Sequence, residues 1–333
     1  MEEQILLSVV IITKDEEENV HKCIESVLRE TASVTSYEII LVDSASEDKT
    51  VELASNYPIR ILQLRPEWFL SPAAGRYVGT KNAQGNYILF IDGDMALKTG
   101  WLKAAVSHLK KDEKIAGVCG RVDDICFDRG RVIKKIKNSN KVDNTESIAS
   151  AFGGAGIYKR SILNEVGGFN PYLRMKEEQE LAMRIRQRGY YLLNIPIDMV
   201  DHYTYNMESL LEARRFLKFL LQPGVGQLFR IAYNNNSFLL CAKETSYAFH
   251  FFIFLFVTLA FIMMVIFLGG GFLYLWFAIV FFFFLLLAVK KKSVGSALVS
   301  CVAKVLYGIN FVCDFPKKPK SPEQYPLNPI IIK

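Results

Sequence analysis

Charged side chains are absent from one long stretch of this 333-residue chain, residues 245–289. The stretch holds 13 of the 24 Phe, whereas 22% of the whole sequence is Asp, Glu, Lys or Arg. About 20 apolar residues suffice for a helix to cross a bilayer, so this stretch fits two crossings with a turn at Gly269-Gly270-Gly271. The separation of charged from apolar sequence excludes a wholly soluble chain, a disordered chain and a fully embedded one.

The lysines around this stretch predict the orientation of a membrane hairpin. Its helices are expected over residues 247–268 and 272–289, with Lys243 before the first and Lys290-Lys291-Lys292 after the second. Lysines favour the cytoplasmic side of a membrane. We therefore expect a multi-pass protein of the cell (inner) membrane whose N-terminal domain is cytoplasmic.

A further apolar segment, residues 294–313, contains Lys304 and two Gly. If it crossed the membrane, the lysine-bearing tail would lie outside, against the positive-inside tendency. We favour an interfacial or re-entrant helix over a third membrane helix, and keep both interpretations open.

Net charge is absent from residues 1–244, which carry 32 Lys and Arg against 32 Asp and Glu. The whole formal charge of +6 comes from residues 290–333. Because the part long enough to fold has no excess of positive charge, we expect no nucleic-acid partner. The six Cys lack CxxC or paired metal-ligand spacing and are expected to be free thiols.

The first part of the chain has the pattern of an α/β domain. Apolar, β-branched runs typical of buried parallel strands alternate with amphipathic segments typical of helices. The expected strands are residues 8–13, 37–42, 59–64 and 87–91, and the expected helices are 16–30, 50–56 and 73–82. This alternation predicts a mainly parallel sheet with helices on both faces, in which ligands bind beyond the carboxyl ends of the strands.

Glycine-rich phosphate-binding loops are absent at those strand ends. Acids stand there instead: Asp15 and its neighbours after the first strand, Asp43 after the second, and Asp92 and Asp94 after the fourth. A sheet edge lined with carboxylates needs a divalent cation to hold a diphosphate, and hard oxygen ligands suit Mg²⁺ or Mn²⁺. The alternative for the Asp-Gly-Asp sequence is turn chemistry alone.

Four segments carry a family resemblance: SVVIITKDEEENVHKCIESVL, EIILVDSASEDKT, GRYVGTKNAQGNYILFIDGD and GGFNPYLRMKEEQELAMRIRQRGY, in this order. Over about residues 5–205 the chain resembles glycosyltransferase family 2, inverting enzymes of the GT-A fold that use nucleotide sugars. The expected fold class is therefore α/β. It combines a Rossmann-like GT-A catalytic domain, with a mainly parallel sheet, and a C-terminal transmembrane helical hairpin.

On the donor side, the resemblance implies contacts with the nucleotide sugar along the strand ends. The matched residues are Thr13, Asp15 and Glu16 beside the nucleotide, Asp43 at the base, Arg76 near the nucleotide, and Asp92 and Gly93 of the DxD sequence. Asp92 and Asp94 would hold Mn²⁺ or Mg²⁺, and His202 matches a histidine that reaches the metal or a phosphate. A surface ion pair is the alternative for Arg76, and a structural strand-end histidine is the alternative for His202.

On the acceptor side, Glu177-Glu178 matches the Glu-Asp pair of the family. The resemblance implies that Glu178 is the general base, with Glu177 as the second candidate. Glu178 stands where Asp is usual, so the choice between the two stays open. The alternatives are helix-start acids favoured by the macrodipole, or ion-pair partners of Lys176 or Arg184.

The expected organisation has four parts: a GT-A domain over 1–206, amphipathic interfacial helices over 207–244, a hairpin over 245–289, and a basic tail over 290–333 with the interfacial or third membrane helix. The expected activity transfers a sugar from a nucleotide diphosphate sugar, UDP-sugar first, to a lipid-linked saccharide in polysaccharide or glycan synthesis. The alternatives are a polyprenyl-phosphate sugar synthase, whose lipid phosphate is itself the nucleophile, and a non-catalytic membrane scaffold.

Overall fold

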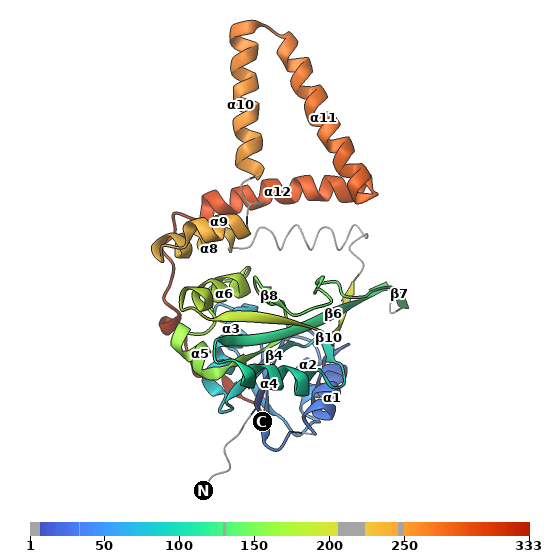
Figure 1. The fold of residues 1–333 in the computed structure, drawn as a ribbon, viewed down its shortest axis with the longest axis vertical. Coiled ribbons are helices and arrows are strands. Elements are labelled where there is room, and N and C mark those ends of the chain that lie inside the picture. Colours follow the sequence, from blue (N-terminus) through green and yellow to red (C-terminus); the bar gives the residue numbers. More distant parts are fainter. Residues whose placement is uncertain (1–6, 33, 129–130, 206–223, 246–249) are drawn as a thin grey trace. The chain divides into compact units, whose positions relative to one another are not determined.

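The computed structural model describes residues 7–32, 34–128, 131–205, 224–245 and 250–333. The chain divides into two compact units (Figure 1), Met1–Asn206 with Lys320–Lys333, and Met207–Pro319. Of the amphipathic interfacial helices expected over 207–244, the part over residues 207–223 lies outside the described residues.

One sheet organises the first unit. Its order is β11-β3-β2-β1-β4-β9-β6-β10-β5, with β7 beside β6 and β8 beside β10. The strands are β1 (Leu7–Thr13), β2 (Tyr37–Asp43), β3 (Arg60–Gln63), β4 (Tyr87–Asp92), β5 (Met95–Leu97), β6 (Ile115–Asp128), β7 (Arg131–Ile136), β8 (Ser147–Ala149), β9 (Gly156–Lys159), β10 (Tyr191–Tyr205) and β11 (Ile330–Ile331). The central strands β3, β2, β1 and β4 are parallel, as predicted, and β6 is parallel to β10.

The helices of this unit connect the strands, as the alternating pattern predicted. They are α1 (Val20–Thr31), α2 (Thr50–Ala54), α3 (Pro72–Asn82), α4 (Trp101–Lys111), α5 (Arg160–Val166) and α6 (Glu177–Gln187). Strand β1 is buried along its whole length, which is why its sequence is a continuous apolar run.

Helix α3 packs closely on β1 because two of its glycines face the strand. A Cβ at Gly79 would lie 2.3 Å from Val10 Cγ1, and one at Gly75 would lie 3.0 Å from Ile12 Cγ2. Only a residue without a side chain fits at the closer position. The close packing brings Arg76 of α3 within reach of Asp92, the last residue of β4.

Residues 320–333 fold as part of the first unit. The expected organisation had placed them in a basic tail over 290–333, apart from that unit. Strand β11 pairs antiparallel with β3, and the 3-10 turn Pro322–Gln324 precedes it. Tyr325 is 3% exposed, and its hydroxyl donates to the Phe69 carbonyl at 2.9 Å. Its ring packs edge-on against the rings of Trp68, Tyr77 and Tyr172. Apolar burial and backbone pairing therefore decide where this segment lies.

The second unit is helical among its described residues. Its helices are α8 (Val225–Asn234), α9 (Phe238–Glu244), α10 (His250–Leu268), α11 (Gly271–Lys291) and α12 (Val294–Asp314). Helices α10 and α11 correspond to the two helices expected in the uncharged stretch. Within this unit they form the two long sides of a triangle, and α12 lies across their base (Figure 1). By length and composition α11 and α12 can cross a membrane, and α10 contains a shorter apolar helix, Phe252–Leu268.

Candidate active site

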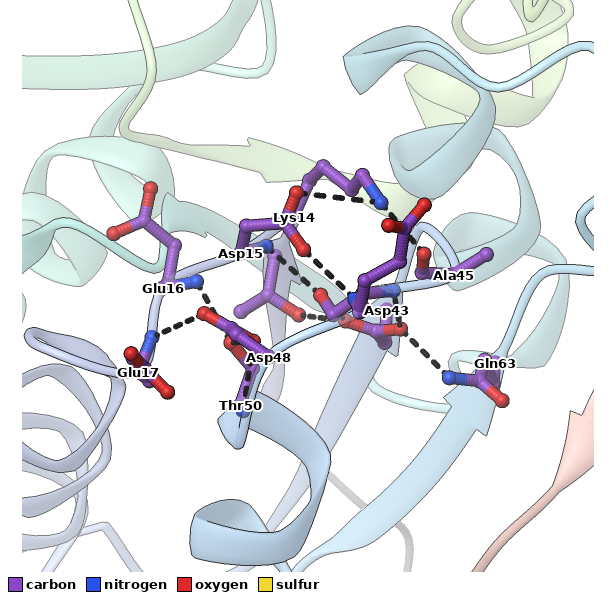
Figure 2. Close-up of polar contacts among 12 residues, drawn as sticks. Lys14, Asp15, Glu16, Glu17, Asp43, Ala45, Asp48, Thr50 and Gln63 are labelled. Atoms are coloured by element: carbon purple, nitrogen blue, oxygen red, sulfur yellow. Dashed lines mark hydrogen bonds and ion pairs between the residues drawn. The ribbon is translucent and has the colours of Figure 1, made fainter.

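The loops after β1 and β2 are joined by hydrogen bonds at the carboxyl edge of the sheet (Figure 2). Three consecutive backbone N–H groups of the first loop donate to side chains of the second, at 2.7 to 3.0 Å. The pairs are Asp15 with Ser46, Glu16 with Thr50, and Glu17 with Asp48. Because these bonds hold residues 15–17 outside the helix, α1 begins at Val20 and not at residue 16 as expected.

Asp43 lies beneath the two loops and is fully buried. Its carboxylate accepts hydrogen bonds from Thr13 Oγ1 at 3.0 Å, from the Ser46 N–H at 2.8 Å, from the Ser46 hydroxyl, and from Gln63 Nε2 at 3.0 Å (Figure 2). Thr13 is buried as well. Asp43 thus anchors the donor-side loops, and its contact with a base stays a prediction.

The Glu16 side chain points away from the loop contacts made by its own N–H (Figure 2). Burial, together with the carboxylates of Asp94 and Asp92, raises the pKa of Glu16 to about 7. Asp15 is exposed by contrast, and its carboxylate accepts from the Glu47 N–H at 2.8 Å. Both residues were predicted to contact the nucleotide. The carboxylates of the DxD turn act on Glu16, whereas Asp15 lies at the exposed edge of the two loops.

The Asp92-Gly93-Asp94 turn connects β4 to β5. The Gly93 N–H donates to the Ile12 carbonyl at 2.9 Å, and a Cβ at Gly93 would lie 2.7 Å from Thr13 Cγ2. The turn therefore lies against the end of β1, at a distance that only glycine permits. This packing places both carboxylates at the predicted edge.

Arg76 occupies the centre of a cluster of carboxylates. Its guanidinium is 2% exposed and forms ion pairs with Asp92 at 2.8 Å, Glu177 at 3.0 Å and Glu178 at 3.3 Å. Burial alone lowers the pKa of Arg76, but the three carboxylates outweigh burial and raise it, so the guanidinium stays charged. The Arg76 side chain therefore joins the DxD turn to the start of α6, and its place near the nucleotide stays a prediction.

Asp94, directly before β5, lies in a row with His202 of β10 and Asp124 of β6. In the sheet register His202 of β10 stands opposite Asp124 of β6 and opposite Met95 of β5, the residue after Asp94. His202 Nε2 lies 3.4 Å from Asp94 Oδ2, and Nδ1 lies 2.9 Å from Asp124 Oδ1. Burial alone lowers the pKa of His202, but these two carboxylates raise it to about 9.

Asp94 has the features of a divalent-cation ligand. Its Oδ1 atom is buried and has no hydrogen-bond partner within the described chain. No group of three or more His, Cys, Asp or Glu side chains among the described residues is arranged to hold an ion alone. Mg²⁺ is usually held by one or two carboxylates together with substrate phosphates and water. The donor set around Asp94 and His202 therefore fits an ion that arrives with a diphosphate.

The two candidate bases differ in burial at the start of α6. Lys176, in the left-handed conformation at φ 67°, precedes the helix. Glu177 is 6% exposed and Glu178 is 17% exposed, measured on the side chains. Burial raises the pKa of Glu177, and the neighbouring Glu178 carboxylate adds to the rise. Glu178 is thus the member of the pair that is more open to a substrate.

Arg184 was the alternative ion-pair partner of Glu177 and Glu178, but it pairs with a different acid. Its guanidinium binds Glu180 through two hydrogen bonds, at 2.7 and 2.5 Å, and donates to the Gly168 carbonyl at 2.6 Å. It therefore fastens α6 to the loop after α5 and leaves Glu178 to Arg76.

Sequence reasoning missed one residue of the site, Asp124, and did not foresee the contact of a second, Gly154, which it placed only in a glycine-rich loop near the acceptor. Asp124 was one acid among many in a long strand, and only the register of β6 with β10 brings it to His202. Gly154 stood in a glycine-rich loop, but a Cβ there would lie 2.1 Å from Asp92 Oδ2. The absence of a side chain at Gly154 keeps the Asp92 carboxylate in place.

Two solved structures that contain UDP or UDP-GlcNAc share this fold. Staphylococcus aureus TarS 1–349 in complex with UDP-GlcNAc superposes with a TM-score of 0.51 at 16% identity, covering 72% of this chain and 73% of that one. GalNAc-T7 with UDP, GalNAc and Mn²⁺ superposes with a TM-score of 0.53 at 18% identity, covering 74% and 57%. These similarities confirm the GT-A fold that the sequence predicted.

The sequence comparison identifies the family. The family model described as Glycosyl transferase family 2 matches residues 8–178, so the chain belongs to glycosyl transferase family 2. Glycosyltransferase AglE of Haloferax volcanii is 24% identical over 192 residues, which cover 56% of this chain and 63% of AglE. The poly(ribitol-phosphate) beta-N-acetylglucosaminyltransferase TarP of Staphylococcus aureus is 26% identical over 227 residues, covering 61% and 67%. The chain thus spans less than two thirds of AglE.

Proposed function

We propose that this glycosyltransferase is a metal-dependent, inverting enzyme anchored in the cell membrane. It transfers a sugar from a nucleotide diphosphate sugar, UDP-sugar first, to a lipid-linked saccharide at the cytoplasmic face. The observation that carries the proposal is the unpartnered, buried oxygen of Asp94, close to a histidine and in the same turn as Asp92, which Arg76 joins to Glu178.

The donor is held at the carboxyl edge of the sheet. Asp43, Thr13 and the joined loops present a rigid wall for the base and ribose, with Asp15 at its exposed rim. Mn²⁺ or Mg²⁺ held by Asp94 and His202 would neutralise the charge that develops on the leaving diphosphate. The complexes of TarS with UDP-GlcNAc and of GalNAc-T7 with UDP support a UDP-sugar donor.

The acceptor side supplies the base. Glu178 takes the proton of the acceptor hydroxyl, whose oxygen attacks the anomeric carbon from the face opposite the leaving phosphate, so the configuration inverts. Arg76 fixes the direction of the Glu178 carboxylate and keeps Glu177 paired beside it. Because Arg76 also binds Asp92, the base and the metal-binding turn share one rigid support.

The apolar helices of the second unit support a membrane anchor. Helices α10 and α11 fill the uncharged stretch, and Lys290, Lys291 and Lys292 follow it, which favours a cytoplasmic catalytic unit. An enzyme anchored in the membrane and a lipid-linked acceptor diffuse in the same bilayer, so the anchor supports an acceptor of this kind. One relative, from Methanococcus voltae and 23% identical over 247 residues, is named for transfer to a dolichyl-phosphate-linked sugar.

The metal assignment predicts the effect of Asp94→Ala on donor turnover. Loss of the unpartnered carboxylate should lower metal-dependent UDP-sugar turnover by about 10²–10³-fold, because electrostatic stabilisation of the leaving group is removed. The measurement is UDP release by the full-length protein in detergent, with Mn²⁺ titrated. Asp198→Ala, at an exposed carboxylate of the same unit, is the matched control and should retain activity. No turnover of any nucleotide sugar by the intact protein would favour the scaffold.

The base assignment predicts the effect of Glu178→Gln on two acceptor types. Transfer to a saccharide hydroxyl should fall by about 10²–10⁴-fold, because the proton acceptor is lost while the shape is kept. The intact protein should not use polyprenyl phosphate. If it does, and Glu178→Gln keeps that activity, the general-base assignment fails and the enzyme is a polyprenyl-phosphate sugar synthase.

A further inference from the structure

The pairing of β11 with β3 constrains the topology of the whole chain. Backbone hydrogen bonds from Ile61 N–H to the Lys333 carbonyl and from Ile332 N–H to the Ile61 carbonyl, at 2.9 and 3.0 Å, tie the two segments. The residues before and after the second unit therefore belong to one folded unit. A folded α/β unit cannot straddle a bilayer, because its loops and sheet edges would be left unsatisfied in lipid. The chain between them must cross the membrane an even number of times.

Three helices of the described second unit are candidates for crossing: α10, α11 and α12. Helix α8 has 10 residues and α9 has 7, far short of the about 20 residues that a crossing needs. The sequence of residues 207–223, which the structure does not describe, contains five charged residues, Glu208, Glu212, Arg214, Arg215 and Lys218. That density of charge is unlike a membrane span. An even number of crossings then selects two of the three helices.

The polar contacts of α12 place its last turn at the water boundary. Asn310 and Asp314 are 6% and 2% exposed, although they lie in a mainly apolar helix. Asp314 Oδ2 accepts from the Gly224 N–H, at the start of α8, at 3.3 Å, and Asp314 Oδ1 accepts from Lys317 Nζ at 2.7 Å. Helix α8 is short and has an exposed polar end, so it cannot lie deep in lipid. The polar end of α12 packs on α8 and must therefore lie at the water boundary.

The exposed side of α12 is an apolar stripe. Its large exposed side chains recur every three or four residues and so share one face, namely Val294, Leu298, Val302, Val305, Ile309 and Val312. Lysines flank the helix, with Lys290, Lys291 and Lys292 before it and Lys317, Lys318 and Lys320 after it.

We propose that α12 does not cross the membrane but lies along the cytoplasmic bilayer surface, on anionic phospholipid. Its apolar stripe enters the headgroup boundary, and the flanking lysines bind the phosphates of the lipids. Helices α10 and α11 make the two crossings. This inference rests on the membrane anchor of the proposed function and adds the number of crossings, the side on which the chain ends, and the surface that meets the lipid.

Cysteine labelling of the full-length protein tests the topology. Cys301 and Cys313 are replaced by serine, because the other four thiols are buried. Single cysteines then replace Ser107 in the catalytic unit, Gly270 in the turn and Ser293 at the start of α12, and native Cys313 is restored separately to report the end of α12. A membrane-impermeant maleimide is applied to sealed vesicles of each orientation.

Ser107→Cys, Ser293→Cys and Cys313 should be labelled from the same face, and Gly270→Cys only from the opposite face. Labelling of Ser293→Cys and Cys313 from opposite faces would overturn the proposal and leave the anchor intact. Labelling of Gly270→Cys from the face of Ser107→Cys would show that the hairpin does not cross, and would overturn the membrane anchor together with this inference.

A depth measurement tests the bilayer contact itself. A polarity-sensitive fluorophore on Leu298→Cys of α12 should be quenched by spin labels near the headgroups, and one on Leu259→Cys of α10 by spin labels deep in the acyl chains. The same fluorophore on Ser107→Cys should not be quenched by either. Deep quenching at Leu298→Cys, or no quenching there in vesicles that contain anionic phospholipid, would overturn the surface position of α12.

Discussion

At the scale of single residues, Asp124 orients a neighbour, His202, that we propose as a metal ligand. A carboxylate at neutral pH only accepts hydrogen bonds, so the 2.9 Å contact requires a proton on Nδ1 of His202. The lone pair of a neutral His202 then lies on Nε2, the atom that faces Asp94. Carboxylates that orient metal-binding histidines in this way contribute to metal affinity without touching the metal.

Asp124→Asn should weaken binding of Mn²⁺ by about 10–100-fold, because the amide no longer fixes the orientation and basicity of the imidazole. Binding is measured without turnover, by electron paramagnetic resonance of free Mn²⁺ in the presence of UDP. The control is Asp198→Asn, because Asp198 lies on β10 with His202 but does not contact it. Unchanged Mn²⁺ affinity in Asp124→Asn would contradict the orienting role.

At the scale of elements, the sequence predicts regular structure where one segment carries the whole signal. The apolar runs of β1, β2 and β4 are found within one residue of their expected bounds, because burial on both faces of a parallel sheet demands such runs. The start of α1 was predicted four residues too early, because the acids of residues 15–18 suit a helix start. The N–H groups of residues 15–17 instead bind side chains 31 to 34 residues away, which no local pattern reveals.

The contact of α3 with β1 gives a test at this scale. Gly79→Ala should destabilise the catalytic unit by about 1–3 kcal/mol through overpacking against Val10, although alanine alone favours a helix by about 1 kcal/mol. The double variant Val10→Ala, Gly79→Ala should recover part of that loss, since the opposing methyl groups are removed. Thermal unfolding of the four members of the cycle measures the coupling. Additive effects would mean that the two residues do not limit the approach of helix and strand.

At the scale of the whole molecule, the sequence separates into a catalytic part and an apolar part but hides how they are joined. The uncharged stretch and the +6 charge after it predicted the helical hairpin and its boundary. The return of residues 320–333 was not predictable, because β11 has two residues and pairs with a strand more than 260 positions earlier. Such a short strand has no periodicity of its own, and its stability comes from Tyr325 and the sheet edge.

This return predicts that the catalytic unit is incomplete without its tail. A chain of residues 1–206 should be less stable by about 3 kcal/mol or more than one in which residues 320–333 follow through a long Gly/Ser linker, because the Tyr325 ring leaves its aromatic site. It should also associate more readily, since the edge of β3 is left unpaired. Thermal unfolding and sedimentation velocity measure both effects.

A peptide of residues 320–333 added to the shorter chain should raise its melting temperature with increasing concentration, whereas a peptide with Tyr325→Ala should not. Equal stability of the two chains would mean that the tail only rests on the catalytic unit.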